Sequence, residues 1–156
     1  MTPNQPSQPP PWLARLGAAR YKLAFLIGLR DVRDIPQRVR RVVPGCATLN
    51  LNLALSRQLL EIPSPQRPTR APIILVDLLA GHGPALLYAI ELLFEPTLQL
   101  EPLRALKAAS RSRILLALWP GTSEDGSLIY AEPGHPEYKR YEPADLAEIL
   151  VVPAPE

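Results

Sequence analysis

Residues 22–35 read KLAFLIGLRDVRDI, in which an apolar run from Leu23 to Ile27 stops at Gly28. A short continuous apolar run of this kind is typical of a strand in a parallel sheet that is buried on both faces. Ligands of such sheets bind beyond the carboxyl ends of the strands, so the loop that starts at Gly28 is the first place to look for a site. The question is whether this loop can hold a phosphate group.

The rest of the chain alternates further apolar runs with helical patterns. Strands are predicted at 22–27, 47–51, 85–90 and 114–119, with one more short strand at the end of 143–153. Helices are predicted at 12–20, 53–62 and 101–112, and a loop or short hairpin at 127–141. The run 72–83 fits either a strand or a helix, and its length and Asp77 favour a helix that stops at Gly81. Strands separated by helices predict an α/β domain with a mainly parallel sheet of about five strands, covered on both faces.

Composition indicates one folded domain with a tail. The chain has 156 residues, of which 47% are apolar, enough for a substantial core. Five prolines lie within the first eleven residues. We therefore expect residues 1–11 to be a disordered or polyproline-II tail and residues 12–156 to form a single domain.

Charge is unevenly distributed, although the net charge is only +2. Residues 1–72 contain 11 basic and 3 acidic residues, whereas residues 73–156 contain 6 basic and 12 acidic residues. The small net charge argues against a bulk polyanion binder. An asymmetry of this kind can orient a partner or align copies of the chain head to tail. The alternative, which is slightly favoured, is that two solvated faces simply differ in sign.

The cysteine content, the amino terminus and the apolar runs indicate the cellular compartment of the protein. A single cysteine, Cys46, excludes an internal disulfide and a cysteine-based zinc site. The amino terminus is proline-rich and polar, unlike a secretory signal. The apolar runs are too short to cross a bilayer. We therefore expect a cytoplasmic protein with no membrane contact.

A phosphate-binding loop has the pattern G-x-x-x-x-G-K-[ST]. Its glycines let backbone N–H groups converge on a phosphate, its lysine reaches the outer phosphates, and its hydroxyl binds magnesium. Aligned on Gly28, this pattern puts Arg33 at the second glycine, Asp34 at the lysine and Ile35 at the hydroxyl. A carboxylate about 4 Å from a phosphate charge is repelled by roughly 4 kcal/mol at an effective dielectric near 20. We therefore expect no phosphate cradle at this loop.

The second half of a nucleotide site is an acidic residue at the end of a buried strand, where it holds magnesium. The run 85–94 places Tyr88 and Ala89 near that position, and neither residue type binds magnesium. Glu91 is the nearest carboxylate. Gly28 and Glu91 are thus the candidates for a vestigial nucleotide site. We expect no cofactor, unless an unorthodox loop binds ATP with magnesium.

Three long and unusual stretches are LNLNLALSRQLLEIP (49–63), IELLFEPTLQLEPLRALKAASRSRILLALWPGT (90–122) and LIYAEPGHPEYKRY (128–141). Together they resemble BrxF, the small P-loop protein of type 3 BREX phage-defence systems, and the resemblance runs from about Lys22 to Leu150. It implies a three-layer P-loop-NTPase-like domain, similar to AAA-type ATPases, and a role in antiviral defence. Because GLRDVRDI and LLYAIE depart from the family pattern, the resemblance implies the fold and the defence setting more than ATP hydrolysis.

The segment 127–141 contains candidate partner-binding residues. Tyrosine and arginine are residue types that anchor protein interfaces, and the prolines of this segment stiffen the chain. The candidates are Tyr130, His135, Tyr138, Arg140 and Tyr141. The same residue types can also stack on bases and bind phosphates, but the interleaved glutamates favour a protein partner over a nucleic acid.

The basic stretch RDVRDIPQRVRRV (30–42) is a further candidate for contact with a partner. Its arginines could bind DNA phosphates. Its aspartates and its lack of aromatic residues favour instead an exposed helix face, with Arg40 and Arg41 available to acidic residues of a neighbour.

His82 and His135 are isolated, with no cysteine partner and no spaced acidic pair, so we expect them to be surface turn residues rather than a metal or catalytic site.

Three functions remain open. The first is a catalytically degenerate P-loop-type subunit of a bacterial antiphage (BREX-like) defence complex, which binds other subunits and can form homo-oligomers. The second is an ATPase of the same system in which Gly28 and Glu91 act with an arginine such as Arg113 from a neighbouring copy. The third is a DNA-binding accessory module that uses the arginine-rich first half. The two incomplete nucleotide motifs favour the first, with DNA contacted only indirectly or weakly.

Overall fold

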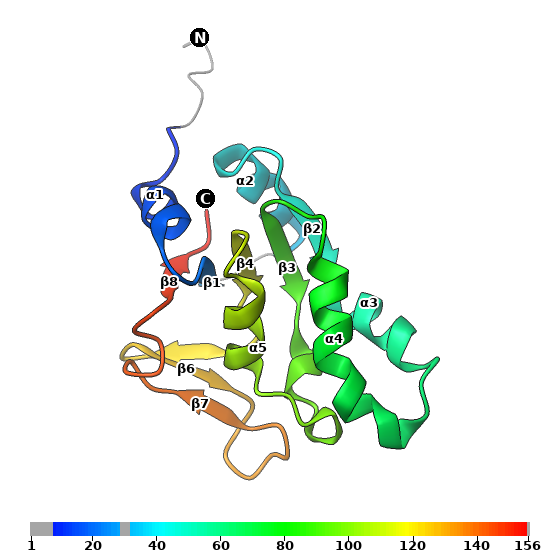
Figure 1. Cartoon of the computed structure of the whole chain (residues 1–156). Helices are drawn as coiled ribbons and strands as arrows, with labels where there is room; N and C mark the ends of the chain where they lie inside the picture. The colour runs from blue at the N-terminus through cyan, green and yellow to red at the C-terminus, as the bar shows by residue number, and fades with distance from the viewer. Residues whose placement is uncertain (1–7, 29–31, 156) are drawn as a thin grey trace.

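The computed structural model describes residues 8–28 and 32–155. Within these residues, the central sheet has five parallel strands in the order β2-β3-β4-β1-β8 (Figure 1). The strands are β1 (Leu23–Ile27), β2 (Ala47–Asn50), β3 (Ala85–Ala89), β4 (Leu115–Leu118) and β8 (Leu150–Pro153). All of them lie within the segments predicted as strands, so the predicted α/β fold with a mainly parallel sheet is confirmed.

Helices cover both faces of this sheet and make a three-layer arrangement (Figure 1). One face carries α1 (Pro11–Ala18) and α2 (Ile35–Val42), and the other carries α3 (Leu51–Leu59), α4 (Arg67–Leu79) and α5 (Pro102–Ala109). Short 3₁₀ helices are η1 (Val32–Asp34), η2 (Ser64–Gln66), η3 (Glu91–Phe94) and η4 (Pro96–Leu98). No helix in the described part of the chain combines the length and the apolar character needed to cross a bilayer.

The two faces of each strand belong to separate cores. On β1, Leu23 and Phe25 pack under α3, α4 and α5, whereas Ala24 and Leu26 pack under α1 and α2. Because both faces are covered, the strand is apolar at every position rather than at alternate ones. Each fully buried leucine or phenylalanine contributes about 1.5–3 kcal/mol relative to an exposed one. The burial of β1 therefore fixes it in the interior of the sheet.

The first helix begins at the last residue of the predicted tail, one residue earlier than expected. Pro11 is the first residue of α1, a position that suits proline because the N–H it lacks has no partner in the first turn of any helix. Residues 8–10 precede it without regular secondary structure. Residues 1–7 of the predicted tail lie outside the described residues.

The segment 72–83, where a helix that stops at Gly81 was predicted, contains a helix, but this helix begins earlier than expected. α4 starts at Arg67, and Pro72 lies inside it. The N–H that Pro72 lacks would have bonded the carbonyl of Pro68 in the first turn, so the helix loses one hydrogen bond near its start rather than being interrupted. At its other end, α4 stops at Leu79, shortly before Gly81, whose φ of 81° suits glycine.

The segment after β4 forms a separate antiparallel sheet in the order β5-β6-β7. Its strands are β5 (Thr122–Glu124), β6 (Ser127–Tyr130) and β7 (Lys139–Tyr141). Asp125 and Gly126 make the turn between β5 and β6 with φ values of 49° and 83°, and Asp-Gly is favoured where both turn residues need positive φ. The short hairpin considered for 127–141 is present as β6 and β7, whereas β5 escaped prediction because its residues are polar and exposed.

Trp119 joins the small sheet to the central sheet. Its indole Nε1–H donates to the backbone carbonyls of Thr122 (3.0 Å) and Ile129 (3.2 Å). Its ring lies edge-on to Phe25 of β1, with 5.2 Å between the ring centroids. A Cβ atom at the neighbouring Gly121 would lie 1.8 Å from the carbonyl oxygen of Ile129. The small sheet therefore packs so closely on the end of β4 that residue 121 can carry no side chain.

We expect Gly121→Ala to lower the free energy of unfolding by about 1–3 kcal/mol, because the added methyl group forces the backbone of β6 to move. Denaturant unfolding of the purified protein measures this change. Gly17→Ala is the matched control, since a Cβ atom at Gly17 in α1 meets nothing within 4 Å. Equal stability of the two variants would contradict the close packing of the small sheet.

Candidate functional site

The connections on either side of β1 create a cleft. After β1 the chain crosses to β2 at one edge of the sheet, whereas after the neighbouring β4 it passes through the small sheet to β8 on the other side of β1. Open α/β sheets bind ligands where adjacent connections diverge in this way. A cleft of about 570 Å³ lies at this place, at the carboxyl ends of β1, β3 and β4. Its polar lining side chains are those of Tyr88, Glu91, Trp119, Thr122 and Ser123.

The cleft brings together Gly28 and Glu91, the two residues singled out from the sequence for a nucleotide site. Gly28 has a φ of 76°, and a Cβ atom there would meet nothing within 4 Å, so β1 ends in a glycine-favoured conformation beside open space. Among the described residues that line the cleft, none is a lysine, an arginine or a histidine. Residues 29–31 of the loop GLRDVRDI lie outside the described residues.

Glu91 is held by Asn52, which was not identified from the sequence. The Asn52 side-chain amide donates to Glu91 Oε2 (2.5 Å), and its Oδ1 accepts from the backbone N–H of Leu92 (2.8 Å). Asn50, two residues earlier, caps α3 by accepting from the backbone N–H of Leu53 (3.0 Å). The alternating pattern LNLN (49–52) indicated that asparagines could make hydrogen bonds at this place, but only the structure shows that the second one, Asn52, contacts η3. One oxygen of the carboxylate in the cleft is thus already engaged.

Asp34 lies directly before α2, where the helix N-terminus would favour a bound anion. Its side chain makes no capping hydrogen bond, and its carboxylate lies 3.9 Å from the Arg38 guanidinium. The chain therefore places its own negative charge at the helix end that follows the loop. A phosphate at this end would meet a carboxylate where a phosphate-binding loop has a lysine.

The tyrosine-rich segment contains an accessible loop between β6 and β7. His135 is exposed, and its Nδ1 accepts from the backbone N–H of Glu137 (3.0 Å), so it shapes the turn. Tyr138 in the same loop is half-buried. Tyr130 at the end of β6 is also half-buried, with its ring centroid 4.0 Å from that of Phe94. The exposed parts of these side chains stay available to a partner.

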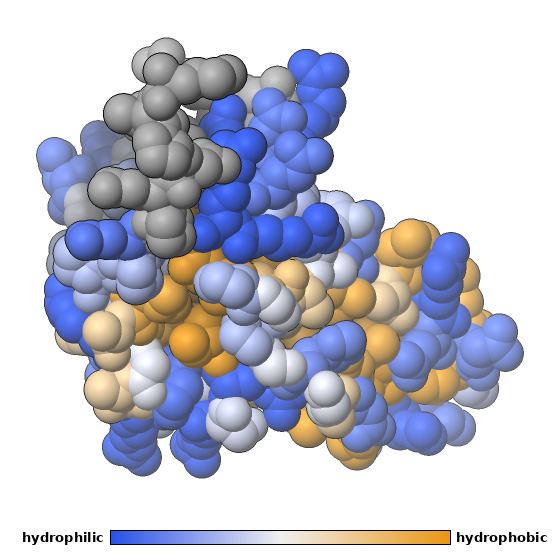
Figure 2. All heavy atoms as spheres, turned by 90° about the horizontal axis from the view of Figure 1, so that it is seen from above, coloured by the Kyte–Doolittle hydropathy of each residue, from blue (hydrophilic) through white to orange (hydrophobic). Residues whose placement is uncertain are grey.

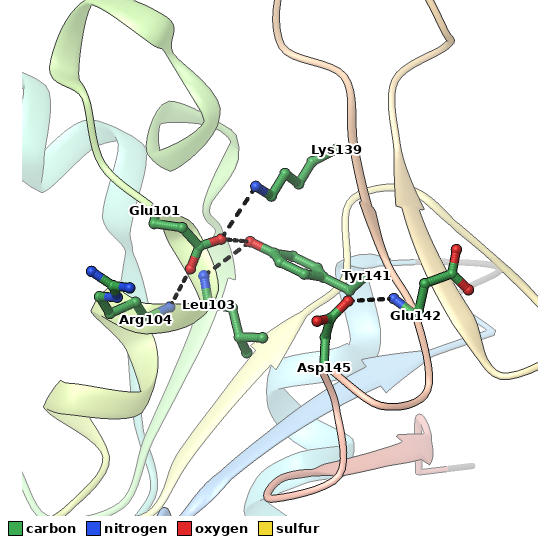
Figure 3. A network of polar contacts seen from close by, with 7 residues as sticks. All are labelled: Glu101, Leu103, Arg104, Lys139, Tyr141, Glu142 and Asp145. Carbon is green, nitrogen blue, oxygen red and sulfur yellow. Dashed lines mark hydrogen bonds and ion pairs between the residues drawn. The ribbon is translucent and has the colours of Figure 1, made fainter.

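Tyr141 is a core residue, which corrects its place among the candidate partner-binding residues. It is only 4% exposed, and its ring centroid lies 6.1 Å from that of Trp119. Its hydroxyl donates to the Glu101 carboxylate and accepts from the backbone N–H of Leu103 (3.1 Å), as Figure 3 shows. Burial, together with the hydrogen bond to Glu101, raises the pKa of Tyr141 far above its ordinary value. The sequence does not show this burial, because it depends on α5, which lies far away along the chain.

The basic candidates are all exposed but differ in their contacts. Arg140 Nε donates to the Glu142 carboxylate (2.6 Å), which also accepts from the Ser127 hydroxyl (2.9 Å), and these hydrogen bonds lower the pKa of Glu142. Arg40 and Arg41 lie in the last turn of α2 and are exposed. Neither forms an ion pair among the described residues. They are therefore more available to an acidic partner than Arg140.

The other residues considered from the sequence do not meet in the structure. His82 lies in the turn before β3, at the end of the central sheet opposite to the loop that carries His135. The described residues contain no group of three or more side chains that could hold a metal ion. Arg113 precedes β4 and so also lies at the end of the sheet opposite to the cleft. It cannot complete the cleft of its own chain.

We expect Tyr141→Phe to lower the free energy of unfolding by about 1–3 kcal/mol, because a buried N–H and a carboxylate each lose a hydrogen-bond partner. Tyr138→Phe is the matched control, since Tyr138 is only half-buried and lies in the loop between β6 and β7. Urea unfolding followed by tryptophan fluorescence measures both changes. A control variant that loses as much stability as Tyr141→Phe would contradict the role given to the Tyr141 hydroxyl.

Comparisons with protein-family models, with curated proteins and with solved structures find no match to this chain. The fold class is therefore established by the strand order and the two helical layers alone. The candidate site is defined by the cleft at the ends of β1, β3 and β4 and by the residues that line it.

Proposed function

We propose that this chain is a catalytically degenerate P-loop-type subunit of a bacterial antiphage, BREX-like defence complex, and that it acts in the cytoplasm through contacts with other proteins. The chemistry of the cleft carries the proposal. The cleft lies where a phosphate loop would act, but its described lining contains no cation, and its carboxylate, Glu91, is bonded to Asn52. Asp34 adds a further negative charge at the start of α2.

The arrangement of the chain supports a P-loop origin. A buried β1 is followed by a loop and then by α2, which is the strand–loop–helix order of a P-loop. Numbered along the chain, the strands of the central sheet lie in the order fifth, first, fourth, third, second. The first strand is thus interior, and its carboxyl end lies where sheets of this kind bind ligands. The resemblance in segments 49–63, 90–122 and 128–141 supplies the defence setting.

Exposed apolar side chains support a role in protein contacts. Leu60, just after α3, is 74% exposed, and Ile73 and Val76 on α4 are about half exposed. In Figure 2, apolar side chains lie among hydrophilic ones on the side of the molecule where α3 and α4 lie. Large exposed apolar areas often mark surfaces that bind another protein. This surface adds to the accessible loop with Tyr138 as a place for partner contacts.

The alternative function is an ATPase that uses an unorthodox loop and an arginine from a neighbouring copy. One observation favours it, namely the size of the cleft. The Nε and Nη1 atoms of Arg113 are buried without a hydrogen-bond partner among the described residues. Because Arg113 lies at the opposite end of its own sheet, this function requires a second copy whose Arg113 enters the cleft.

We expect no ATP hydrolysis above background, because no cation among the described lining residues neutralises a phosphate in the cleft. Phosphate release from magnesium–ATP is measured with the wild type, with and without its partner subunits, and with Glu91→Gln. Glutamine keeps an acceptor for Asn52 but cannot bind magnesium as a carboxylate does. Turnover in the wild type that falls in Glu91→Gln would establish the ATPase and contradict the proposal.

In a bacterium that carries the complete defence system, we expect Glu91→Gln to restrict phage plating as well as the wild type does. Arg41→Glu should weaken restriction, because the reversed charge repels an acidic partner, and the loss should be accompanied by weaker assembly of the complex. Arg15→Glu is the matched control, since Arg15 and Arg41 are both exposed in the last turn of an eight-residue helix. Unchanged plating after deletion of the whole chain would rule out a defence role.

A further inference from the structure

A second pocket, of about 640 Å³, lies between α5 and β7 and shares no lining residue with the cleft. Residues 73–156 contain 6 basic and 12 acidic residues, yet five of the six basic residues line this pocket. They are Arg104, Lys107, Arg111, Lys139 and Arg140. The acidic half of the chain thus concentrates its positive charge in one place, which we call the basic pocket.

The carboxylates that line the basic pocket are already engaged by the protein itself. Glu101 accepts hydrogen bonds from the Tyr141 hydroxyl and from the backbone N–H of Arg104 (2.6 Å), and it lies 3.6 Å from the Lys139 ammonium (Figure 3). Asp145 accepts from a backbone N–H of its own loop (2.8 Å). These two carboxylates fix the wall of the pocket. Arg140 is paired with Glu142 (2.6 Å), whereas the guanidinium groups of Arg104 and Arg111 have no ion pair among the described residues.

Three cations surround the half-buried ring of Tyr21 at the other end of the basic pocket. Lys107 Nζ lies 4.6 Å from the ring centroid, and the guanidinium carbons of Arg20 and Arg111 lie 5.2 Å and 5.5 Å from it. Of these cations, only Lys107 has an ion pair among the described residues, 3.6 Å from Glu148. Like charges gathered round one ring repel each other, and a bound anion would offset this repulsion.

We propose that the basic pocket binds a ligand that carries two or more phosphate groups. Arg104 lies in the first turn of α5, whereas Arg111 follows the end of this helix at Ala109, so the two arginines suit separate phosphates of one ligand. Neither guanidinium has an ion pair among the described residues. A guanidinium matches phosphate geometry because it donates two parallel hydrogen bonds. The ligand is a nucleotide or a single-stranded nucleic acid, because both present the same phosphate groups to these arginines.

This proposal goes beyond the proposed function and is independent of it. The site needs no magnesium and uses neither Gly28 nor Glu91, so phosphate binding in the basic pocket is compatible with an inactive cleft. Glu91→Gln should therefore leave it unchanged.

Calorimetry with inorganic tripolyphosphate, on the full chain and without magnesium, tests the proposal. We expect saturable binding that weakens about tenfold or more in Arg104→Gln/Arg111→Gln, because two charge-assisted contacts are lost. Arg57→Gln/Arg70→Gln is the control, since it removes the same charge from exposed arginines of α3 and α4 and should keep wild-type affinity. Thermal melting checks each variant, and the single variants Arg104→Gln and Arg111→Gln serve if the double variant is unstable.

A fluorescein-labelled oligo(dT) and ATP distinguish the sources of phosphate. The basic pocket binds nucleic acid if tripolyphosphate displaces the oligonucleotide and if Arg104→Gln/Arg111→Gln no longer binds the oligonucleotide. It binds a nucleotide if only tripolyphosphate and ATP bind. The absence of saturable binding for all three probes overturns the proposal. Equal weakening in Arg57→Gln/Arg70→Gln overturns it too, because overall charge would then explain the binding. Loss of binding in Glu91→Gln would show that the ligand binds in the cleft, and this outcome would also overturn the proposal.

Discussion

Trp119 occupies the position where the central sheet, η3 and the small sheet meet. Its indole N–H is shared between two backbone carbonyls of the segment 122–129, and its ring lies against Phe25 and Phe94. A buried acceptor that loses its donor costs about 1–3 kcal/mol. The path of the chain after β4, and with it the position of Tyr141 beside α5, depends on this one side chain.

Through this anchor, the small sheet contributes to two sites of opposite character. Its first residues, Thr122 and Ser123, lie in the cleft, whose described lining has one carboxylate and no cation. Its last strand contributes Lys139 and Arg140 to the basic pocket. The hydroxyl of Tyr141 fixes that strand against the start of α5. A chain of this architecture can lose the chemistry of its cleft without disturbing the wall of the basic pocket, because the two sites have no lining residue in common.

The central strands were predictable because a strand covered on both faces must be apolar at each position, as β1 is. The same rule does not find β5, whose residues are exposed, and it does not show that Tyr141 is buried, because the partners of Tyr141 come from α5. Gly28 and Glu91 could be named from the sequence as neighbours in one cleft, whereas Asn52 could not, since its partner lies in η3. The basic pocket could not be predicted from the sequence, because its residues come from separate segments. In addition, residues 73–156 are acidic on average, so their few basic residues do not stand out.

The place of β1 within the sheet has a consequence for the order in which the protein folds. Leu23 pairs with Leu115, and Ala24 pairs with Leu150, so both neighbours of the strand come from late in the chain. Pairing over such separations requires the closure of long loops before any contact is gained, which slows folding. Meanwhile β2, β3 and the helices between them can associate over shorter distances. During synthesis, β1 therefore remains an unpaired apolar segment until most of the chain has emerged, and an unpaired apolar segment of this kind is prone to aggregate.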